Sequence, residues 1–336
     1  MPQVDANMAP MPVPMVELWR GGLLEGQHFG HAVICDERGE IIEAWGNPDL
    51  VMFPRSSSKM IQALPLLESG AGRDLTTEQL ALSCASHSGM PMHTTRVERW
   101  LADLGLTHAD LRCGTHEPSN QAAREALIKS DTSPCPLHNN CSGKHSGFLT
   151  LNKHLGGHSE YIEVDHPVQI ACKAATEEVT GITAPGYGID GCSAPNFATT
   201  LHGLARAMSY FATATDSGTT RQRAAHKLAN AMMSHPELVA GEGRACTEIM
   251  RAFPGEAAVK TGAEGVFIAI LPKLKRGIAL KISDGGTRAS EAVLTALLVR
   301  LGVMPADHPA ARRMNAVQVN CGGRETGVLR IADGFL

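Results

Sequence analysis

Ser56 and Lys59 are the first residues whose types and spacing suggest chemistry. They form an S-x-x-K element directly before the largely apolar run at 60–67. If this segment is helical, positions i and i+3 share a face, so the Lys59 amine can reach the Ser56 hydroxyl. A serine hydroxyl becomes an effective nucleophile when a neighbouring base accepts its proton. The element therefore predicts a serine nucleophile with a lysine base.

A second lysine is needed, because an amine accepts a proton near pH 7 only when burial or another cation keeps it neutral. Lys260 offers that cation in the K-T-G element at 260–262. S-x-x-K followed far downstream by K-T-G is the order found in the serine penicillin-recognising hydrolases. S-x-x-K alone arises by chance about once in a chain of this length, whereas K-T-G is rarer. The ordered pair is therefore the informative signal.

Composition excludes several functional classes. Of the 336 residues 43% are hydrophobic and 4% aromatic, which is typical of a soluble globular protein. The net charge of −4 argues against nucleic acid as a partner. No stretch reaches the roughly 18 apolar residues of a membrane helix, and the start of the chain lacks the pattern of a signal peptide. Nine scattered cysteines do not resemble a secreted disulfide framework, so we expect a cytoplasmic protein with reduced thiols and no membrane partner.

The chain divides by periodicity into two lobes. Alternating patterns predict strands at 16–20, 30–35 and 41–45, and again at 257–260, 265–271, 277–282 and 327–331. Helical patterns predominate between them, at 78–84, 93–104, 121–129, 167–179, 197–212 and 220–234, with one more helix at 288–301. We predict a flexible tail over 1–15, an α/β lobe with an antiparallel sheet over 16–56 and 253–336, and a mainly helical lobe over 57–252. The active site would lie at the lobe boundary.

Two further clusters carry residues with possible chemical roles. Cys141 precedes Lys144 and His145, while Cys192 follows Asp190 in a separate loop. Two thiols near a basic residue can hold a soft-leaning metal such as zinc, and spacing alone favours His145 over Lys144 as a further ligand. The alternative is that both cysteines simply fill the core beside tight turns.

A short segment with Ser86 and His87 follows the predicted helix at 78–84. Ser86 or Ser88 could present a second hydroxyl to the cleft, and His87 could act there as an acid or base. The alternative is an ordinary helix end, where serine, glycine and histidine are common.

Six ordered motifs together resemble one enzyme family, the class 3 L-asparaginases of the rhizobial, thermolabile, serine/lysine type. The resemblance extends from about Trp19 to the carboxyl end. Its motifs are P-R-S-S-S-K at 54–59, C-A-S-H at 84–87, N-C-S-G-K-H at 140–145, D-G-C at 190–192, V-A-G-E-G-R at 239–244 and K-T-G-A at 260–263.

The resemblance implies an α/β fold similar to serine β-lactamases and penicillin-binding proteins, in which an antiparallel sheet is flanked by helices and carries an inserted helical lobe. It implies an amidohydrolase that converts L-asparagine to L-aspartate and ammonia. Ser56 would be the nucleophile and Lys59 its base, and Ser86 and Lys260 would form a second serine/lysine tandem.

A zinc site is also implied, with Cys141, Lys144 and Cys192 as ligands, although zinc need not be essential for catalysis. Asp190 would then lie beside the metal or contact the substrate amine, and His87 would lie near the substrate. Arg55 either binds the substrate carboxylate or forms a structural ion pair.

Rival functions remain at this point. K-T-G with threonine after the lysine also suits a β-lactamase-like or peptidase-like acyl hydrolase, and a non-catalytic amino-acid- or metal-binding protein of the same fold is a third possibility. Glutamine is an alternative substrate, because one methylene provides only about 1–3 kcal/mol of discrimination. A homodimer is the default assembly.

Overall fold

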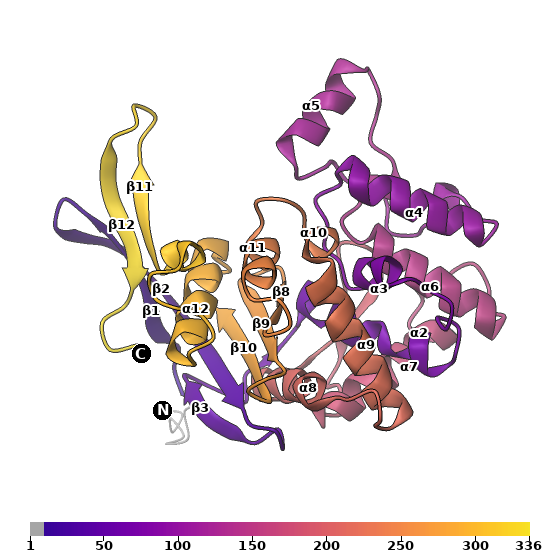
Figure 1. Ribbon diagram of the computed structural model, residues 1–336, viewed down its shortest axis with the longest axis horizontal. Helices are drawn as coiled ribbons and strands as arrows, with labels where there is room; N and C mark the ends of the chain where they lie inside the picture. Colours follow the sequence, from indigo (N-terminus) through magenta and orange to yellow (C-terminus); the bar gives the residue numbers. More distant parts are fainter. Residues whose placement is uncertain (1–9) are drawn as a thin grey trace, which may run out of the picture.

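An antiparallel sheet built from both ends of the chain forms the frame of the protein. The computed structural model describes residues 10–336 (Figure 1). The strand order is β11-β12-β1-β2-β10-β9-β8, and β3 pairs with β2. The strands are β1 (Val13–Arg20), β2 (Leu23–Cys35), β3 (Ile41–Trp45), β8 (Ala258–Thr261), β9 (Val266–Leu271), β10 (Arg276–Ile282), β11 (Asn315–Val319) and β12 (Glu325–Ile331).

The sheet is covered most extensively by helices α8 (Leu201–Thr213) and α12 (Thr287–Arg300). β9 is buried at every position, which explains why its sequence is continuously apolar rather than alternating. Gly277 of β10 allows α8 to approach, because a Cβ there would lie 2.2 Å from the carbonyl oxygen of Ala205. The close approach buries the apolar faces of both elements.

Most remaining helices form the other side of the molecule in Figure 1. They begin at recognisable signals: in α3, the Thr76 side chain accepts from the Gln79 amide while the Gln79 side chain accepts from the Thr76 amide. The helices are α1 (Lys59–Gln62), α2 (Leu64–Glu68), α3 (Thr77–Ser83), α4 (Pro91–Asp103), α5 (Gln121–Lys129), α6 (Ser142–Leu155), α7 (Pro167–Thr180), α9 (Thr220–Ser234), α10 (Pro236–Val239) and α11 (Ala245–Ala252).

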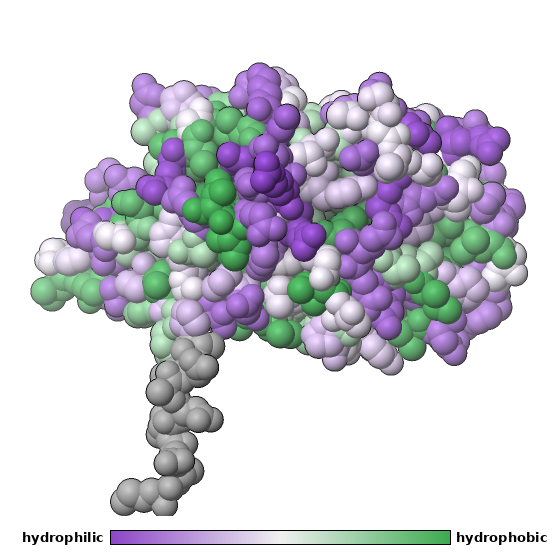
Figure 2. Space-filling view, turned by 90° about the horizontal axis from the view of Figure 1, so that it is seen from below, coloured by the Kyte–Doolittle hydropathy of each residue, from purple (hydrophilic) through white to green (hydrophobic). Residues whose placement is uncertain are grey.

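Short elements complete the chain and connect the two sides. They are the pair β4 (Val51–Met52) and β7 (Thr199–Thr200), the hairpin β5 (Tyr187–Ile189) and β6 (Pro195–Phe197), and the 3-10 turns η1 (Arg55–Ser58), η2 (His108–Asp110), η3 (Pro136–His138) and η4 (Pro309–Met314). On the face displayed in Figure 2, apolar residues lie in patches interrupted by hydrophilic ones.

The predicted fold class, an antiparallel sheet flanked by helices with a mainly helical lobe, is confirmed. Two boundaries differ from those expected. Residues 1–9 of the expected tail lie outside the described residues, whereas β1 begins at Val13 because Val13 pairs with Gly30 of β2. Helix α8 falls in the segment assigned to the helical lobe, yet it packs on β10. Within residues 10–336 the structure contains no helix with the length and apolarity needed to cross a membrane.

Candidate active site

The turn η1 distinguishes Ser56 from its two serine neighbours. The Ser57 hydroxyl donates to the Pro54 carbonyl at 2.7 Å, and the Ser58 hydroxyl donates to the Arg55 carbonyl at 3.0 Å. Both side chains are buried and serve the turn itself. Ser56 is partly exposed, and its hydroxyl makes no hydrogen bond within residues 10–336. Of the three serines, Ser56 is therefore the one whose hydroxyl is available for chemistry.

Ser86 lies between two buried lysines. Its hydroxyl oxygen is 2.9 Å from the Lys59 Nζ and 2.7 Å from the Lys260 Nζ. Lys59 begins α1, Ser86 follows α3, and Lys260 lies on β8, so three separate elements converge here. Both lysines are at most 1% exposed. The structure thus brings together Lys59, Ser86 and Lys260, three of the four residues in the two predicted tandems.

The two amines differ in their hydrogen bonds and therefore in the charge they favour. The Lys59 Nζ faces three acceptors, because it also lies 2.6 Å from the Ala85 carbonyl oxygen and 3.1 Å from the Cys141 Sγ. Three acceptors suit an ammonium group, which has three protons to donate. The Lys260 Nζ has two partners, the Ser86 hydroxyl and the Thr261 carbonyl at 2.8 Å.

Burial and the charge of Lys59 lower the pKa of Lys260 from 10.5 to about 7. Lys260 is thus the amine that is substantially neutral near pH 7. A neutral amine donates two hydrogen bonds and accepts one, so Lys260 can donate to the Thr261 carbonyl while accepting from the Ser86 hydroxyl. Ser86 then accepts a hydrogen bond from Lys59, which completes a path for a proton between the two amines.

Lys59 has a different contact from the one expected. No hydrogen bond joins its amine to Ser56 in the described part of the chain, and the Lys59 amine contacts Ser86 and Cys141 instead. The amine is drawn to these buried acceptors because an ammonium group in the interior requires partners. Ser56 still lies three residues before Lys59, on the turn that leads into α1.

The thiol cluster adjoins this chain of hydrogen bonds. The Lys144 Nζ, in the first turn of α6, lies 3.1 Å from the Cys192 Sγ, and Cys141 immediately precedes the same helix. A hydrogen bond from Cys141 and the charge of Lys144 hold the pKa of Cys192 well below its ordinary value, against the effect of burial. The contact with Cys192 raises the pKa of Cys141 well above its ordinary value. Cys141 thus links the thiols to Lys59.

Burial and nearby negative charge act on the pKa of the Lys144 amine in opposite directions. Burial disfavours its charge, but Cys192 and Cys141 outweigh burial and raise the pKa of Lys144 above its ordinary value. Within residues 10–336, no three side chains drawn only from His, Cys, Asp and Glu are placed to hold a metal. A metal site at this cluster would therefore have to draw at least one ligand from outside those four residue types, and Lys144 is the adjacent nitrogen.

Arg55 and Asp190, both expected near the substrate, bind each other. The Arg55 Nη2 and Nε lie 2.8 and 3.1 Å from the same oxygen, Asp190 Oδ1. Both side chains remain partly exposed, at 28% and 14%. The pair places a cation and an anion next to the turn that carries Ser56.

His87 is not placed as expected. Its Nε2 lies 2.9 Å from the Ser142 hydroxyl, its Nδ1 accepts from the Gly89 amide at 3.2 Å, and its ring stacks on His93. Burial holds its pKa well below the ordinary value. Because both ring nitrogens are engaged in the interior, the structure gives His87 no contact to offer a substrate.

Two residues near Ser56 escaped the sequence reasoning. The Asn196 Oδ1 accepts from the Arg55 amide at 3.1 Å. A Cβ on Gly262 would lie 2.8 Å from the Pro54 carbonyl oxygen and 3.2 Å from the Ser57 amide nitrogen, so the end of β8 abuts η1 only because residue 262 is glycine. The K-T-G motif contained the signal for Gly262, whereas Asn196 lies in no motif that the sequence singles out.

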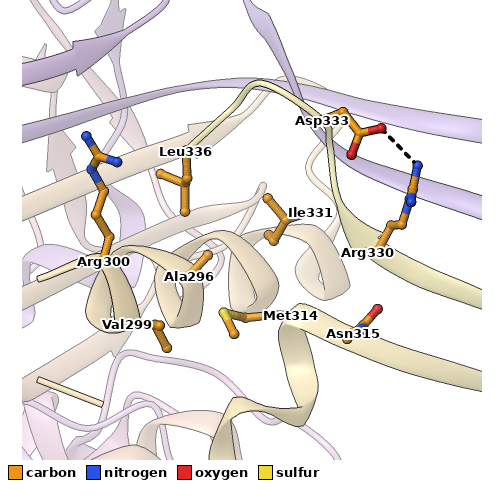
Figure 3. Close-up of a pocket in the computed structure, with 9 residues that line it drawn as sticks. All are labelled: Ala296, Val299, Arg300, Met314, Asn315, Arg330, Ile331, Asp333 and Leu336. Carbon is orange, nitrogen blue, oxygen red and sulfur yellow. Dashed lines mark hydrogen bonds and ion pairs between the residues drawn. The ribbon is translucent and has the colours of Figure 1, made fainter. Parts of the chain in front are cut away.

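A surface hollow of about 580 Å³ lies elsewhere, between α12 and the carboxyl end of the chain (Figure 3). Arg330 and Asp333 face each other across part of it at 3.2 Å, above an apolar floor. None of the predicted site residues lines it, so it is separate from the Ser86 cluster. Its lining residues are Ala296, Val299, Arg300, Met314, Asn315, Arg330, Ile331, Asp333 and Leu336.

Comparison with solved structures gives distant likenesses. Mglu in its native form is 14% identical with a TM-score of 0.43, and the match covers 83% of this chain but only 66% of Mglu. A β-lactamase from Mycobacterium bovis is 14% identical with a TM-score of 0.43, covering 81% of this chain and 94% of that one. D-alanine carboxypeptidase AmpC from Burkholderia cenocepacia is 14% identical with a TM-score of 0.40, covering 80% and 93%. Likenesses at these scores carry no argument by themselves.

The sequence matches one protein family over nearly its whole length. No curated protein matches the chain. The family model described as L-asparaginase II matches residues 16–331, which is nearly the whole sequence and includes every motif of the predicted resemblance. The chain therefore belongs to the L-asparaginase II family.

Proposed function

We propose that the protein hydrolyses L-asparagine to L-aspartate and ammonia through a serine acyl-enzyme. The observation that carries this proposal is the hydrogen-bonded series Lys59–Ser86–Lys260 beside the unengaged hydroxyl of Ser56. Together these supply a nucleophile and a path for its proton, in a chain of the L-asparaginase II family.

Proton transfer through Ser86 prepares the base. Lys59 passes a proton to Ser86, and Ser86 passes its own proton to neutral Lys260, so Lys59 becomes neutral while the total charge is unchanged. The 2.9 and 2.7 Å contacts permit both transfers without movement of heavy atoms. Lys59 then takes the Ser56 proton. For this step the Lys59 amine must turn away from Ser86 towards η1, which precedes α1 and carries Ser56.

Acyl transfer proceeds in two balanced halves. The Ser56 oxygen bonds to the side-chain amide carbon of the substrate, the carbon–nitrogen bond breaks, and the nitrogen leaves as ammonia with the proton held by Lys59. Water then attacks the ester, its proton returns through Lys59 to the Ser56 oxygen, and L-aspartate is released. The Arg55 guanidinium would bind the substrate α-carboxylate and Asp190 its α-ammonium group.

The proposed holder of zinc is the cluster of Cys141, Lys144 and Cys192. The Cys192 thiol favours the thiolate, and the Lys144 amine that donates to it at 3.1 Å, together with the Cys141 thiol, would supply one nitrogen and a second sulfur donor once both lose a proton. When bound, zinc would supply a fixed positive charge beside the proton path and would hold the Asp190 loop through Cys192. Lys144 would have to be neutral to act as a ligand.

Ammonia release from L-asparagine and L-glutamine, measured with and without added zinc, tests the proposal. Ser56→Ala should abolish release, whereas the neighbouring Ser57→Ala should retain it, because the Ser57 hydroxyl bonds only the Pro54 carbonyl. Intact mass spectrometry should detect the acyl-enzyme in the wild type alone. Nitrocefin turnover without ammonia release would favour the β-lactamase-like alternative, and asparagine binding without turnover would favour a non-catalytic role. The homodimer expected from the sequence stays a prediction, which light scattering on the purified protein tests.

A further inference from the structure

The backbone immediately before Ser56 has an unusual conformation. Arg55 has a φ of 53°, in the left-handed region that side-chain-bearing residues rarely adopt. Such a conformation is unfavourable for a residue with a side chain and persists only where the surroundings hold it. The direction in which the chain enters η1, and hence the placement of Ser56, depends on whatever holds Arg55.

One hairpin holds Arg55 at both its backbone and its side chain. Asn196 on β6 accepts a hydrogen bond from the Arg55 amide at 3.1 Å, and Asp190, just beyond β5, binds the guanidinium at 2.8 Å. Asn196 is only 3% exposed and its backbone pairs with Gly188 across the hairpin, so the β5–β6 pair holds the residue in place. The backbone N–H of Arg55 also fixes the orientation of the Asn196 side-chain amide, because Oδ1 can accept a hydrogen bond and Nδ2 cannot.

The opposite side of the turn is closed by β8. A Cβ on Gly262 would lie 2.8 Å from the Pro54 carbonyl oxygen, which leaves η1 no room to shift in that direction. Residues 54–57 are therefore held between the end of β8 and the β5–β6 hairpin. The hairpin loop also carries Cys192, so the thiol cluster and the Ser56 turn share one support.

We propose that Asn196 is a positioning residue, whose amide oxygen holds Arg55 in the left-handed conformation and thereby directs the Ser56 hydroxyl towards its reaction partner. The inference rests on the proposed role of Ser56 as nucleophile. It goes beyond that role by identifying what fixes the nucleophile. It also means that displacement of the Cys192 loop is transmitted to Ser56 through Asn196.

Two substitutions separate the acceptor from mere packing. Asn196→Ala removes the oxygen, whereas Asn196→Asp keeps an acceptor oxygen in the same place but adds a buried negative charge, so thermal unfolding of both variants is measured beside their rates. A displacement of about 1 Å can cost about a hundredfold in rate. We therefore expect Asn196→Ala to lower kcat for L-asparagine by about ten- to a hundredfold with a KM change below about threefold, and Asn196→Asp to restore kcat to within about threefold of the wild type. If the alanine variant does not fold, Asn196→Ser, which is too short to reach the Arg55 amide, replaces it.

A second measurement makes the result independent of the substrate. A fluorophosphonate probe labels reactive serines, and mass spectrometry reports the labelling rate at Ser56. Asn196→Ala should slow labelling about tenfold or more, and Asn196→Asp should not. Asn152→Ala is the matched control, because Asn152 is also buried but donates to the His158 carbonyl, away from the hairpin. It should change neither rate by more than about twofold, because it removes a single hydrogen bond at a site that is independent of the hairpin.

The outcomes distinguish the two proposals. In one outcome the wild type does not hydrolyse asparagine, but the labelling rate of Ser56 falls in Asn196→Ala. This result would refute the proposed substrate and support the positioning role. Labelling and kcat that are unaffected in Asn196→Ala would overturn the positioning role while leaving the asparaginase proposal in place. Equal losses in the alanine and aspartate variants would also overturn it, because the acceptor oxygen would then not be the cause.

Discussion

The neutral state of Lys260 leads to a sharp prediction about pH. The relay through Ser86 begins only when Lys260 can accept a proton, so turnover must fall when this amine is protonated. Burial and the Lys59 charge lower its pKa from 10.5 to about 7. Activity is therefore expected to be low in acid, to rise as pH increases through about 7, and to level off above it.

The magnitude follows from the neutral fraction. With a pKa of 10.5, only about one Lys260 amine in three thousand would be neutral at pH 7, whereas a pKa of about 7 makes about half of them neutral. Below the midpoint the neutral fraction falls about tenfold for each pH unit. We expect kcat/KM for L-asparagine at about pH 5 to be about a hundredfold below its plateau.

The assay is steady-state ammonia release between about pH 5 and about pH 9, with circular dichroism at each pH as a check that the fold persists. Lys260→Arg is the informative variant, because guanidinium keeps the positive charge but does not deprotonate in this range. Its plateau rate should fall by about 10²–10⁴-fold, the usual contribution of a general base, and the inflection near pH 7 should disappear. Lys260→Met should lose the inflection as well.

Two results would refute the reasoning. A wild-type rate that still rises about tenfold per pH unit up to about pH 9, with no plateau, would show that Lys260 is not neutral near pH 7 in the folded protein. An unchanged inflection near pH 7 in Lys260→Arg would show that another group titrates, and the direction of the proton path would then have to be reassigned.

Three other substitutions test the surroundings of Ser56. Gly262→Ala places a methyl group 2.8 Å from the Pro54 carbonyl oxygen, so kcat should fall by about tenfold; activity within about twofold of the wild type would contradict the close packing of β8 on η1. Arg55→Lys replaces the planar guanidinium that contacts Asp190 through two nitrogens, so KM for L-asparagine should rise about tenfold with a smaller change in kcat, and an unchanged KM would argue against carboxylate binding. Cys192→Ser should lower zinc content in elemental analysis, and an unaltered zinc-to-protein ratio would count against the metal site.

Most regular elements were predictable because their local patterns are strong. The helix expected at 121–129 is α5 (Gln121–Lys129), and the one expected at 220–234 is α9 (Thr220–Ser234). Helix α6 (Ser142–Leu155) was not predicted, although it carries Lys144. It is buried at every position from Ser142 to Asn152, so it lacks the alternation of polar and apolar faces by which a helix is recognised in sequence.

The sequence by itself determined the family and supplied the candidate reactive groups, because ordered motifs such as S-x-x-K and K-T-G persist in the chain regardless of how it folds. Tertiary structure decided how those groups are connected. Lys59 turns to Ser86 and Cys141 rather than Ser56, and His87 turns inward to Ser142. Only the fold creates the buried environment that lowers the pKa of Lys260, and only the fold places Asn196 on the amide of Arg55, 141 residues away in the chain. Hydrogen bonding and desolvation depend on neighbours in space, and spacing along the chain does not specify those neighbours.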